Sequence, residues 1–261
     1  MNFDIYPSLI GDCILSEPAM TALAIRKNMS VGLYIEEHLR PLYYEHPYIT
    51  LLDQKPTNAI KINCSKALSY AFSHNCYFGE AYFEQVGLIR KSEDRIYYKN
   101  YHSTLLEKTE QKNTIVIAPF SRSCSIHNSA KANKTAPLEW WEPILHRWNR
   151  AKLDIICLGA IDEPLFPYCT NIRGENLLKV AKTIKDSRIF ISVDTGLLHI
   201  ASNLAKNIVL LNAALPPVII SPKANMVNYK DLSVYEISSY PGPPNWDIET
   251  LLDIIAENVS Y

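Results

Sequence analysis

From residue 114 onward, short apolar runs alternate with longer amphipathic stretches. The apolar runs have the length of buried strands and end at turn residues or polar loops; they cover residues 114–118, 153–158, 171–173, 189–193 and 208–211. Between them, residues 137–150, 177–185 and 197–204 carry apolar side chains at helical spacing. This alternation predicts the α/β class, with a parallel sheet covered by helices on both faces.

The first part of the chain, up to residue 110, has a less regular pattern. We expect a strand within residues 1–10, a helix over 18–27, a strand at 31–35 and a largely helical stretch over 61–87. The polar run 108–113 is the best linker candidate, and a proline-rich connector at 240–244 precedes a last helix over 248–258. The pattern therefore divides the chain into parts 1–110, 111–240 and 241–261.

Composition and charge are those of an ordinary globular protein. The chain has 261 residues, 48% of them hydrophobic and 20% charged, which suits one large domain or two small ones. Lys and Arg number 26 against 27 Asp and Glu, so the net charge is −1. A protein whose main task is to grip nucleic acid usually has a basic surplus, and this balance argues against that class, while leaving room for a local basic strip.

The cysteines and the apolar stretches indicate the compartment. None of the six cysteines forms a Cys-x-x-Cys pair, and no Cys/His cluster has zinc spacing. The N-terminus lacks the basic start and apolar core of a signal peptide. The longest apolar stretch, 208–220, is interrupted by Asn212, Pro216 and Pro217 and is shorter than the ~20 residues of a membrane span. We expect a soluble, cytoplasmic protein.

The clearest candidate site follows the run 189–193, where Asp194, Thr195 and Gly196 open a helix and His199 lies on its first turn. A helix N-terminus presents free backbone N–H groups and the positive end of the helix dipole, which together attract anions. Glycine also lets the backbone approach a phosphate closely. The ordinary alternative is that Asp194 or Thr195 simply caps the helix.

Three other polar groups also follow predicted strands. Lys134 lies in a polar loop before a helix, Glu163 follows the run 153–158, and the pair Gly11-Asp12 follows the first strand. Taken singly, these are explained as a solvated lysine, a helix-start acid and a plain turn. Because ligands bind at the carboxyl ends of parallel strands, four such groups after four strands favour a binding site over four separate coincidences.

The sequence segments that contain these groups, and their order along the chain, resemble those of the ADP-heptose:lipopolysaccharide heptosyltransferase family. The resemblance is dense over residues 114–211 and in the first part rests mainly on residues 10–27. It is carried by four segments: Gly11-Asp12-x-Ile14-Leu15-x-x-Pro18, Lys134-x-x-Pro137-x-Glu139-x-Trp141, Gly159-Ala160-x-x-Glu163 and Ser192-Val193-Asp194-Thr195-Gly196-x-x-His199.

The resemblance implies the GT-B architecture, in which two Rossmann-like lobes with parallel sheets face each other across a cleft. The acceptor would bind the lobe at 1–110 and the nucleotide sugar the lobe at 111–240, while the helix in 241–261 would pack back across both. The first lobe looks reduced, because the stretch between its first helix and Lys108 is too short for the usual set of β–α units.

The same resemblance implies a role for each candidate residue. Asp12 would be the catalytic base of an inverting transfer, and the donor would be held by Lys134, Glu163, Asp194, Thr195, Gly196 and His199. Within that set, Lys134 and the Thr195-Gly196 turn would hold the diphosphate, Glu163 the nucleoside and Asp194 the sugar. The chain has no Asp-x-Asp motif to cradle a metal–diphosphate complex. We therefore expect a metal-independent enzyme without a cofactor, whose co-substrate is a nucleoside-diphosphate sugar, ADP-linked in the family.

The acceptor side is less defined. Gly11 and the tyrosines at 34, 43, 44 and 48 are candidate acceptor residues, with the aromatic rings as a stacking platform. Half-buried packing is the alternative explanation for these tyrosines. The loop at 212–217 also departs from the family, which commonly has a Gly-containing turn followed by Thr there.

Three functions remain open on this basis. The first is transfer of a heptose-like sugar to a glycan or lipopolysaccharide-type hydroxyl. The second is a compact, phage-type enzyme that glycosylates hydroxylated DNA bases; the reduced lobe motivates it, and the near-neutral charge argues mildly against it. The third is a non-catalytic sugar-nucleotide-binding protein, which the carboxylate at Asp12 argues against. Sugar, nucleotide, acceptor and oligomeric state are not determined by the sequence.

Overall fold

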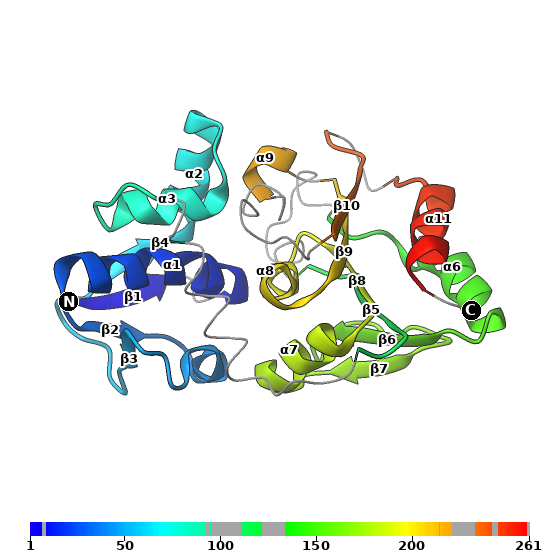
Figure 1. Ribbon diagram of the computed structural model, residues 1–261, viewed down its shortest axis with the longest axis horizontal. Helices are drawn as coiled ribbons and strands as arrows, with labels where there is room; N and C mark the ends of the chain where they lie inside the picture. Colours follow the sequence, from blue (N-terminus) through cyan, green and yellow to red (C-terminus); the bar gives the residue numbers. More distant parts are fainter. Residues whose placement is uncertain are drawn as a thin grey trace. The chain divides into compact units, whose positions relative to one another are not determined.

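The computed structural model describes residues 1–6, 9–91, 94, 111–121, 134–213, 215–220, 233–241 and 245–259. The chain divides into two compact units (Figure 1): Met1–Glu107 with Val218–Asn228, and Lys108–Pro217 with Tyr229–Tyr261. The short helix α9 (Pro217–Ile220) thus falls mainly in the first unit. Each unit is built around its own parallel sheet.

The described part of the first unit contains a four-stranded sheet in the order β3-β2-β1-β4. Its strands are β1 (Asn2–Tyr6), β2 (Val31–Tyr34), β3 (Ile49–Leu51) and β4 (Ile60–Asn63). The helices are α1 (Ile10–Lys27), the 3-10 helix η1 (Glu37–Tyr43), α2 (Cys64–His74) and α3 (Phe78–Gln85). Contacts with both α1 and α2 place α3 against each of these helices.

The start of the first helix was predicted wrongly. Helix α1 begins at Ile10 and not at Pro18, so Gly11 and Asp12 lie in its first turn rather than in a loop. Burial explains the longer helix, because Cys13, Ile14 and Leu15 are core residues. Pro18 inside the helix lacks an N–H and removes one backbone hydrogen bond. The stretch 61–87 is largely helical as predicted, in α2 and α3, but its first residues belong to strand β4, which lacks an apolar run.

The described part of the second unit contains a six-stranded sheet in the order β10-β9-β8-β5-β6-β7. The strands are β5 (Thr114–Ala118), β6 (Asp154–Gly159), β7 (Thr170–Arg173), β8 (Ile189–Val193), β9 (Asn207–Asn212) and β10 (Ser233–Ser238). The helices are α6 (Leu138–Arg150), α7 (Leu177–Asp186), α8 (Gly196–Leu204) and α11 (Ile248–Asn258). All five strands predicted for this part are present, and β10 is an additional edge strand.

Both sheets share one topological feature that matters for function. In the second unit the chain runs from β5 outward to β6 and β7, then returns to place β8 on the other side of β5. In the first unit β4 is likewise placed beside β1, on the side away from β2. Ligands of open α/β sheets bind at the carboxyl ends of the strands that flank such a switch point. The segments after β5 and β8, and after β1 and β4, are therefore where binding residues are expected.

The core of the second unit includes its last helix. Trp141 and Trp148 of α6 are fully buried in the same cluster as Leu251 and Ile255 of α11. The connector before α11 is anchored by Trp246, whose indole Nε1 donates to the Asn212 carbonyl at 2.9 Å. Helix α11 is thus part of the second unit's core; its packing across the first lobe stays a prediction.

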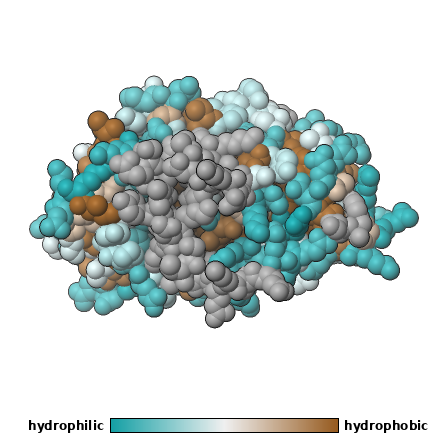
Figure 2. Space-filling view, viewed as in Figure 1, coloured by the Kyte–Doolittle hydropathy of each residue, from teal (hydrophilic) through white to brown (hydrophobic). Residues whose placement is uncertain are grey.

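The described residues show no membrane-spanning helix, no large hydrophobic patch on the face seen and no disulfide. None of the described helices is long and apolar enough to cross a membrane. On the face seen in Figure 2, hydrophilic residues dominate and hydrophobic ones lie in small separate groups. The five cysteines in the described ranges are free thiols, and Cys124 lies outside those ranges.

Candidate active site

The segments after β5 and β8 bring together two of the candidate residues. Asp194 directly follows β8, and Lys134 lies just before α6 in the connection from β5. The Lys134 Nζ donates to Asp194 Oδ2 at 2.5 Å, although the two residues are 60 positions apart in the sequence. Nearby, the Ser121 backbone N–H donates to Thr135 Oγ1 at 3.3 Å and joins the two ends of that connection. This ion pair lies at the switch point of the second sheet.

The charges of this group follow from burial and proximity. Asp194 is 7% exposed, and burial alone would raise its pKa; the Lys134 charge and hydrogen bond, with His199, hold the pKa below its usual value. His199 is equally buried, and burial lowers its pKa to about 4 because the opposing effect of Asp194 is weaker. At neutral pH the group is therefore a lysine–aspartate ion pair beside a neutral imidazole.

Helix α8 begins beside this ion pair. Thr195 is its N-cap residue, in an extended conformation, and its side chain makes no capping hydrogen bond to the described residues. Thr195 and Gly196 are partly exposed, whereas the Asp194 carboxylate is turned into the ion pair. Side-chain capping, the ordinary explanation for this segment, is therefore not what is observed at Thr195. The helix start keeps backbone N–H groups suited to an anion.

Glu163 lies in the turn after β6, in a separate group at the same edge of the sheet. Its Oε2 accepts a hydrogen bond from the Ala160 backbone N–H at 2.9 Å. A Cβ at position 159 would lie 2.2 Å from that oxygen, so a larger residue there would displace the Glu163 carboxylate. Arg173 of β7 connects to β6 and to the turn: its Nη1 donates to the Cys157 carbonyl and its Nη2 to the Pro164 carbonyl, both at 2.7 Å. The sequence patterns gave no indication of Arg173.

In the first unit, Asp12 lies at the carboxyl end of β1, beside that sheet's switch point. The residue is 3% exposed, and its Oδ1 accepts a hydrogen bond from the Tyr82 hydroxyl of α3 at 2.5 Å. Gly11 precedes it and is partly exposed. Tyr82 is 70 positions away and was not predicted.

The four tyrosines do not share one environment. Tyr43 is buried, and its hydroxyl donates to the Cys13 carbonyl, so packing describes this residue and its ring presents no open face. Tyr34 ends β2 and is half-buried, while Tyr44 and Tyr48 are 43% and 41% exposed. A stacking platform stays a prediction for those three.

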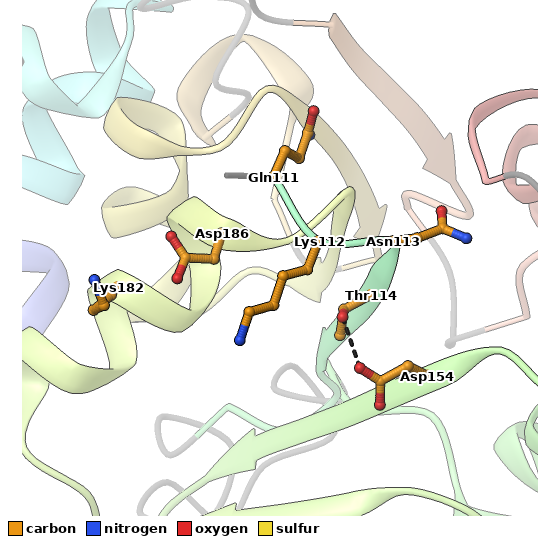
Figure 3. A pocket seen from close by; sticks show the side chains of 7 residues that line it. All are labelled: Gln111, Lys112, Asn113, Thr114, Asp154, Lys182 and Asp186. Atoms are coloured by element: carbon orange, nitrogen blue, oxygen red, sulfur yellow. Dashed lines mark hydrogen bonds between the residues drawn. The ribbon is translucent and has the colours of Figure 1, made fainter. Parts of the chain in front are cut away.

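A hollow of about 820 Å³ lies elsewhere on the second unit (Figure 3). It is at the amino ends of β5 and β6, where Thr114 Oγ1 donates to Asp154 Oδ2 at 2.7 Å. Its other lining residues are Gln111, Lys112, Asn113, Lys182 and Asp186. The hollow is thus at the opposite edge of the sheet from Lys134, Glu163 and Asp194.

Two α/β units, each with a parallel sheet and a switch point, make the fold GT-B-like, as expected from the resemblance. The structure of E. coli heptosyltransferase WaaC with ADP matches with a TM-score of 0.61 at 14% identity, over 99% of both chains. The E. coli ADP-heptose lipopolysaccharide heptosyltransferase II matches at 0.58 and 14%, over 98% of both chains. A family 9 glycosyl transferase from Veillonella parvula matches at 0.59 and 14%, over 98% of this chain and 91% of that one.

These matches establish the fold. No family model matches the chain, and no curated protein matches its sequence. At 14% identity the fold is shared, whereas donor, acceptor and mechanism have to be argued from the residues of this chain.

Proposed function

We propose that this protein is an inverting, metal-independent glycosyltransferase. It transfers a heptose-like sugar from a nucleoside-diphosphate donor to a hydroxyl of a glycan or lipopolysaccharide-type acceptor. The observation that carries the proposal is the Lys134–Asp194 pair beside the start of α8, at the switch point of a GT-B-like fold. Solved structures with this fold include a heptosyltransferase with ADP.

The donor side follows from the chemistry of the second unit. A diphosphate meets the Lys134 ammonium and the backbone N–H groups at Thr195 and Gly196, which favour negative charge. At ~4 Å and an effective dielectric near 20, one such cation attracts a unit charge by ~4 kcal/mol. In this proposal Asp194 orients Lys134 and also accepts a hydrogen bond from a sugar hydroxyl. His199 supports the turn, and Glu163 contacts the nucleoside.

The chemical step uses the first unit's carboxylate. Asp12 accepts the proton of an acceptor hydroxyl while that oxygen forms a bond to the anomeric carbon of the donor. The bond from this carbon to the diphosphate breaks on the opposite face, and its electron pair leaves with the nucleoside diphosphate. The configuration inverts, and Lys134 and the α8 N-terminus stabilise the leaving charge. A positioned base contributes about 10²–10⁴-fold to such a step.

Transfer assays test the proposal. ADP-, UDP-, GDP- and CDP-sugars are screened by thermal shift, and the donor that stabilises the protein is offered with lipopolysaccharide-type glycans or hydroxymethylated DNA. We expect turnover to a glycan with inverted anomeric configuration by NMR, unchanged by EDTA and lowered about 10²–10⁴-fold by Asp12→Ala. Asp53→Ala, an exposed acid of the same unit, is the matched control.

Each contrary result removes a defined part of the proposal. Unchanged turnover in Asp12→Ala removes the base, and activity lost in EDTA removes metal independence. Transfer to DNA alone favours the second acceptor class. Binding of a nucleotide sugar without transfer to any acceptor leaves a sugar-nucleotide-binding protein.

A further inference from the structure

The buried hydroxyl of Tyr82 donates its hydrogen bond to a carboxylate rather than to the backbone. Its side chain is fully buried in α3, and Phe78 packs on its ring with centroids 5.4 Å apart. A buried phenol needs a hydrogen-bond partner. Many buried tyrosines find a backbone carbonyl, as Tyr43 does in this unit. Tyr82 instead donates to the carboxylate of Asp12 at 2.5 Å.

The location of this bond points to function. Asp12 follows β1 and Tyr82 lies on the second helix after β4, so the bond joins elements from the two sides of the first sheet's switch point. Burying a carboxylate is costly, and an apolar pair of the same shape can be as stable as a buried polar pair. Asp12 combines such burial and a side-chain donor with a place at the switch point, where binding and catalytic groups are expected in α/β sheets.

The proton of this bond stays on the phenol. Burial raises the Tyr82 pKa well above its usual value, and the nearby charge of Asp12 raises it further. Tyr82 is therefore a donor at every working pH, and Asp12 is held as the acceptor. A donor to a carboxylate favours its ionised form and fixes its orientation.

We propose that Tyr82 is a positioning residue for Asp12, holding the ionised carboxylate in the orientation in which it accepts the proton of the acceptor hydroxyl. This inference rests on the proposed function, because it assigns Asp12 the role of base. Tyr82 itself touches neither substrate; it acts through Asp12.

The Tyr82→Phe variant tests this role, since it keeps the ring and removes the hydroxyl. The matched control is Thr21→Val, because Thr21 Oγ1 donates at 2.6 Å to another buried carboxylate of α1, that of Glu17. We expect Tyr82→Phe to lower kcat by about tenfold or more, the effect of one hydrogen bond to a charged group. The KM for the donor should stay unchanged, and the acidic limb of the pH–rate profile should move to higher pH. Thr21→Val should keep the wild-type limb.

Two further variants separate position from packing. Replacement of Tyr82 by para-aminophenylalanine keeps the shape and an N–H donor, so it should restore most of the rate even where Tyr82→Phe folds poorly. In an Asp12→Asn background, Tyr82→Phe should cause no further loss of rate. A Tyr82→Phe profile that matches Thr21→Val, with no shift of the acidic limb, overturns the inference while leaving the proposed function standing. Unchanged turnover in Asp12→Ala removes the proposed function itself.

Discussion

At the scale of single residues, the second unit holds an ion pair and a neutral histidine in one buried group. Asp194 and His199 are 7% and 6% exposed, yet one is charged and the other is not. Burial lowers the pKa of His199 and keeps its imidazole neutral, with a smaller contribution from the Lys134 charge. Burial opposes the charge of Asp194 too, but the Lys134 charge and hydrogen bond outweigh it and keep the carboxylate ionised. The charges of the group therefore sum to zero at neutral pH, with Lys134 paired to Asp194 beside a neutral imidazole.

His199 should give the second unit a pH dependence in a defined window. Its pKa is about 4 in the folded protein and about 6.5 when unfolded, so protons favour the unfolded state. The free energy of unfolding that depends on neutral His199 is fully present above pH 6.5 and falls by about 3 kcal/mol as the pH drops to 4. His199→Gln should flatten this decline, measured by urea unfolding with tryptophan fluorescence. The exposed His38→Gln is the control, and an equal decline in both variants would contradict the assignment.

Lys134→Met should destabilise the second unit, because it leaves the Asp194 charge buried without its partner. Breaking a buried pair costs about 3–5 kcal/mol, and the 17% exposure of Lys134 places the expected loss near the lower end. Adding Asp194→Asn should recover part of it, since no uncompensated charge then remains. Lys179→Met, in an exposed i,i+4 pair, should cost less than about 0.5 kcal/mol. Equal losses for the two lysines would show that the Lys134 pair contributes no more than a surface pair.

At the scale of elements, the turn after β6 is built around Gly159. The Glu163 carboxylate lies where a Cβ of residue 159 would be, so Gly159→Ala forces it away from the Ala160 N–H. We expect a loss of about 1–2 kcal/mol, the cost of a broken hydrogen bond to a charged group, together with weaker nucleotide binding. In a Glu163→Ala background the same change should cost less, because the closest clashing group is gone and only the Arg173 guanidinium, 3.1 Å from the new Cβ, has to adjust. Strictly additive losses in urea unfolding would contradict this account.

The elements that were predictable are those with a strong apolar period. Helices α6, α7 and α11 and the central strands bury one stripe or a whole run, and their patterns located them to within a few residues. Strands β3 and β4 are short and β10 is mostly half-buried, so none of the three has the buried apolar run that separates a strand from a loop in sequence. The start of α1 was missed because Pro18 has the typical character of a first helical residue, whereas burial of residues 13–15 decided the outcome.

The candidate site residues also separate into those that the sequence could predict and those that it could not. Lys134, Glu163 and Asp194 could be nominated as candidates because each follows a strand, and strand ends are visible in the sequence. Tyr82 and Arg173 could not be predicted from the sequence. Tyr82 lies inside helix α3 and Arg173 at the end of strand β7, where nothing in the neighbouring sequence distinguishes them from packing residues. Their partners depend on the tertiary fold and not on nearby sequence.

At the scale of the whole molecule, the two units carry different parts of the proposed reaction. Lys134, Glu163, Asp194 and His199 belong to the second unit, whereas Asp12 and Tyr82 belong to the first. Donor binding and proton transfer should therefore respond to separate sets of mutations. The four tryptophans, at positions 140, 141, 148 and 246, all lie in the second unit, so their fluorescence reports on that unit alone.

A nucleoside diphosphate should accordingly stabilise the transition seen by tryptophan fluorescence. A ligand that binds only the folded state adds ~2.7 kcal/mol at ~100 times its Kd, and ADP is the first probe to use. Lys134→Met should abolish the shift, because the phosphates lose their cation, while Asp12→Ala should leave it unchanged. Far-UV circular dichroism, which follows both units, shows whether the stabilisation extends beyond the second. A shift that survives Lys134→Met but is lost in Asp12→Ala would place the nucleotide on the first unit and reverse the assignment of donor and acceptor sides.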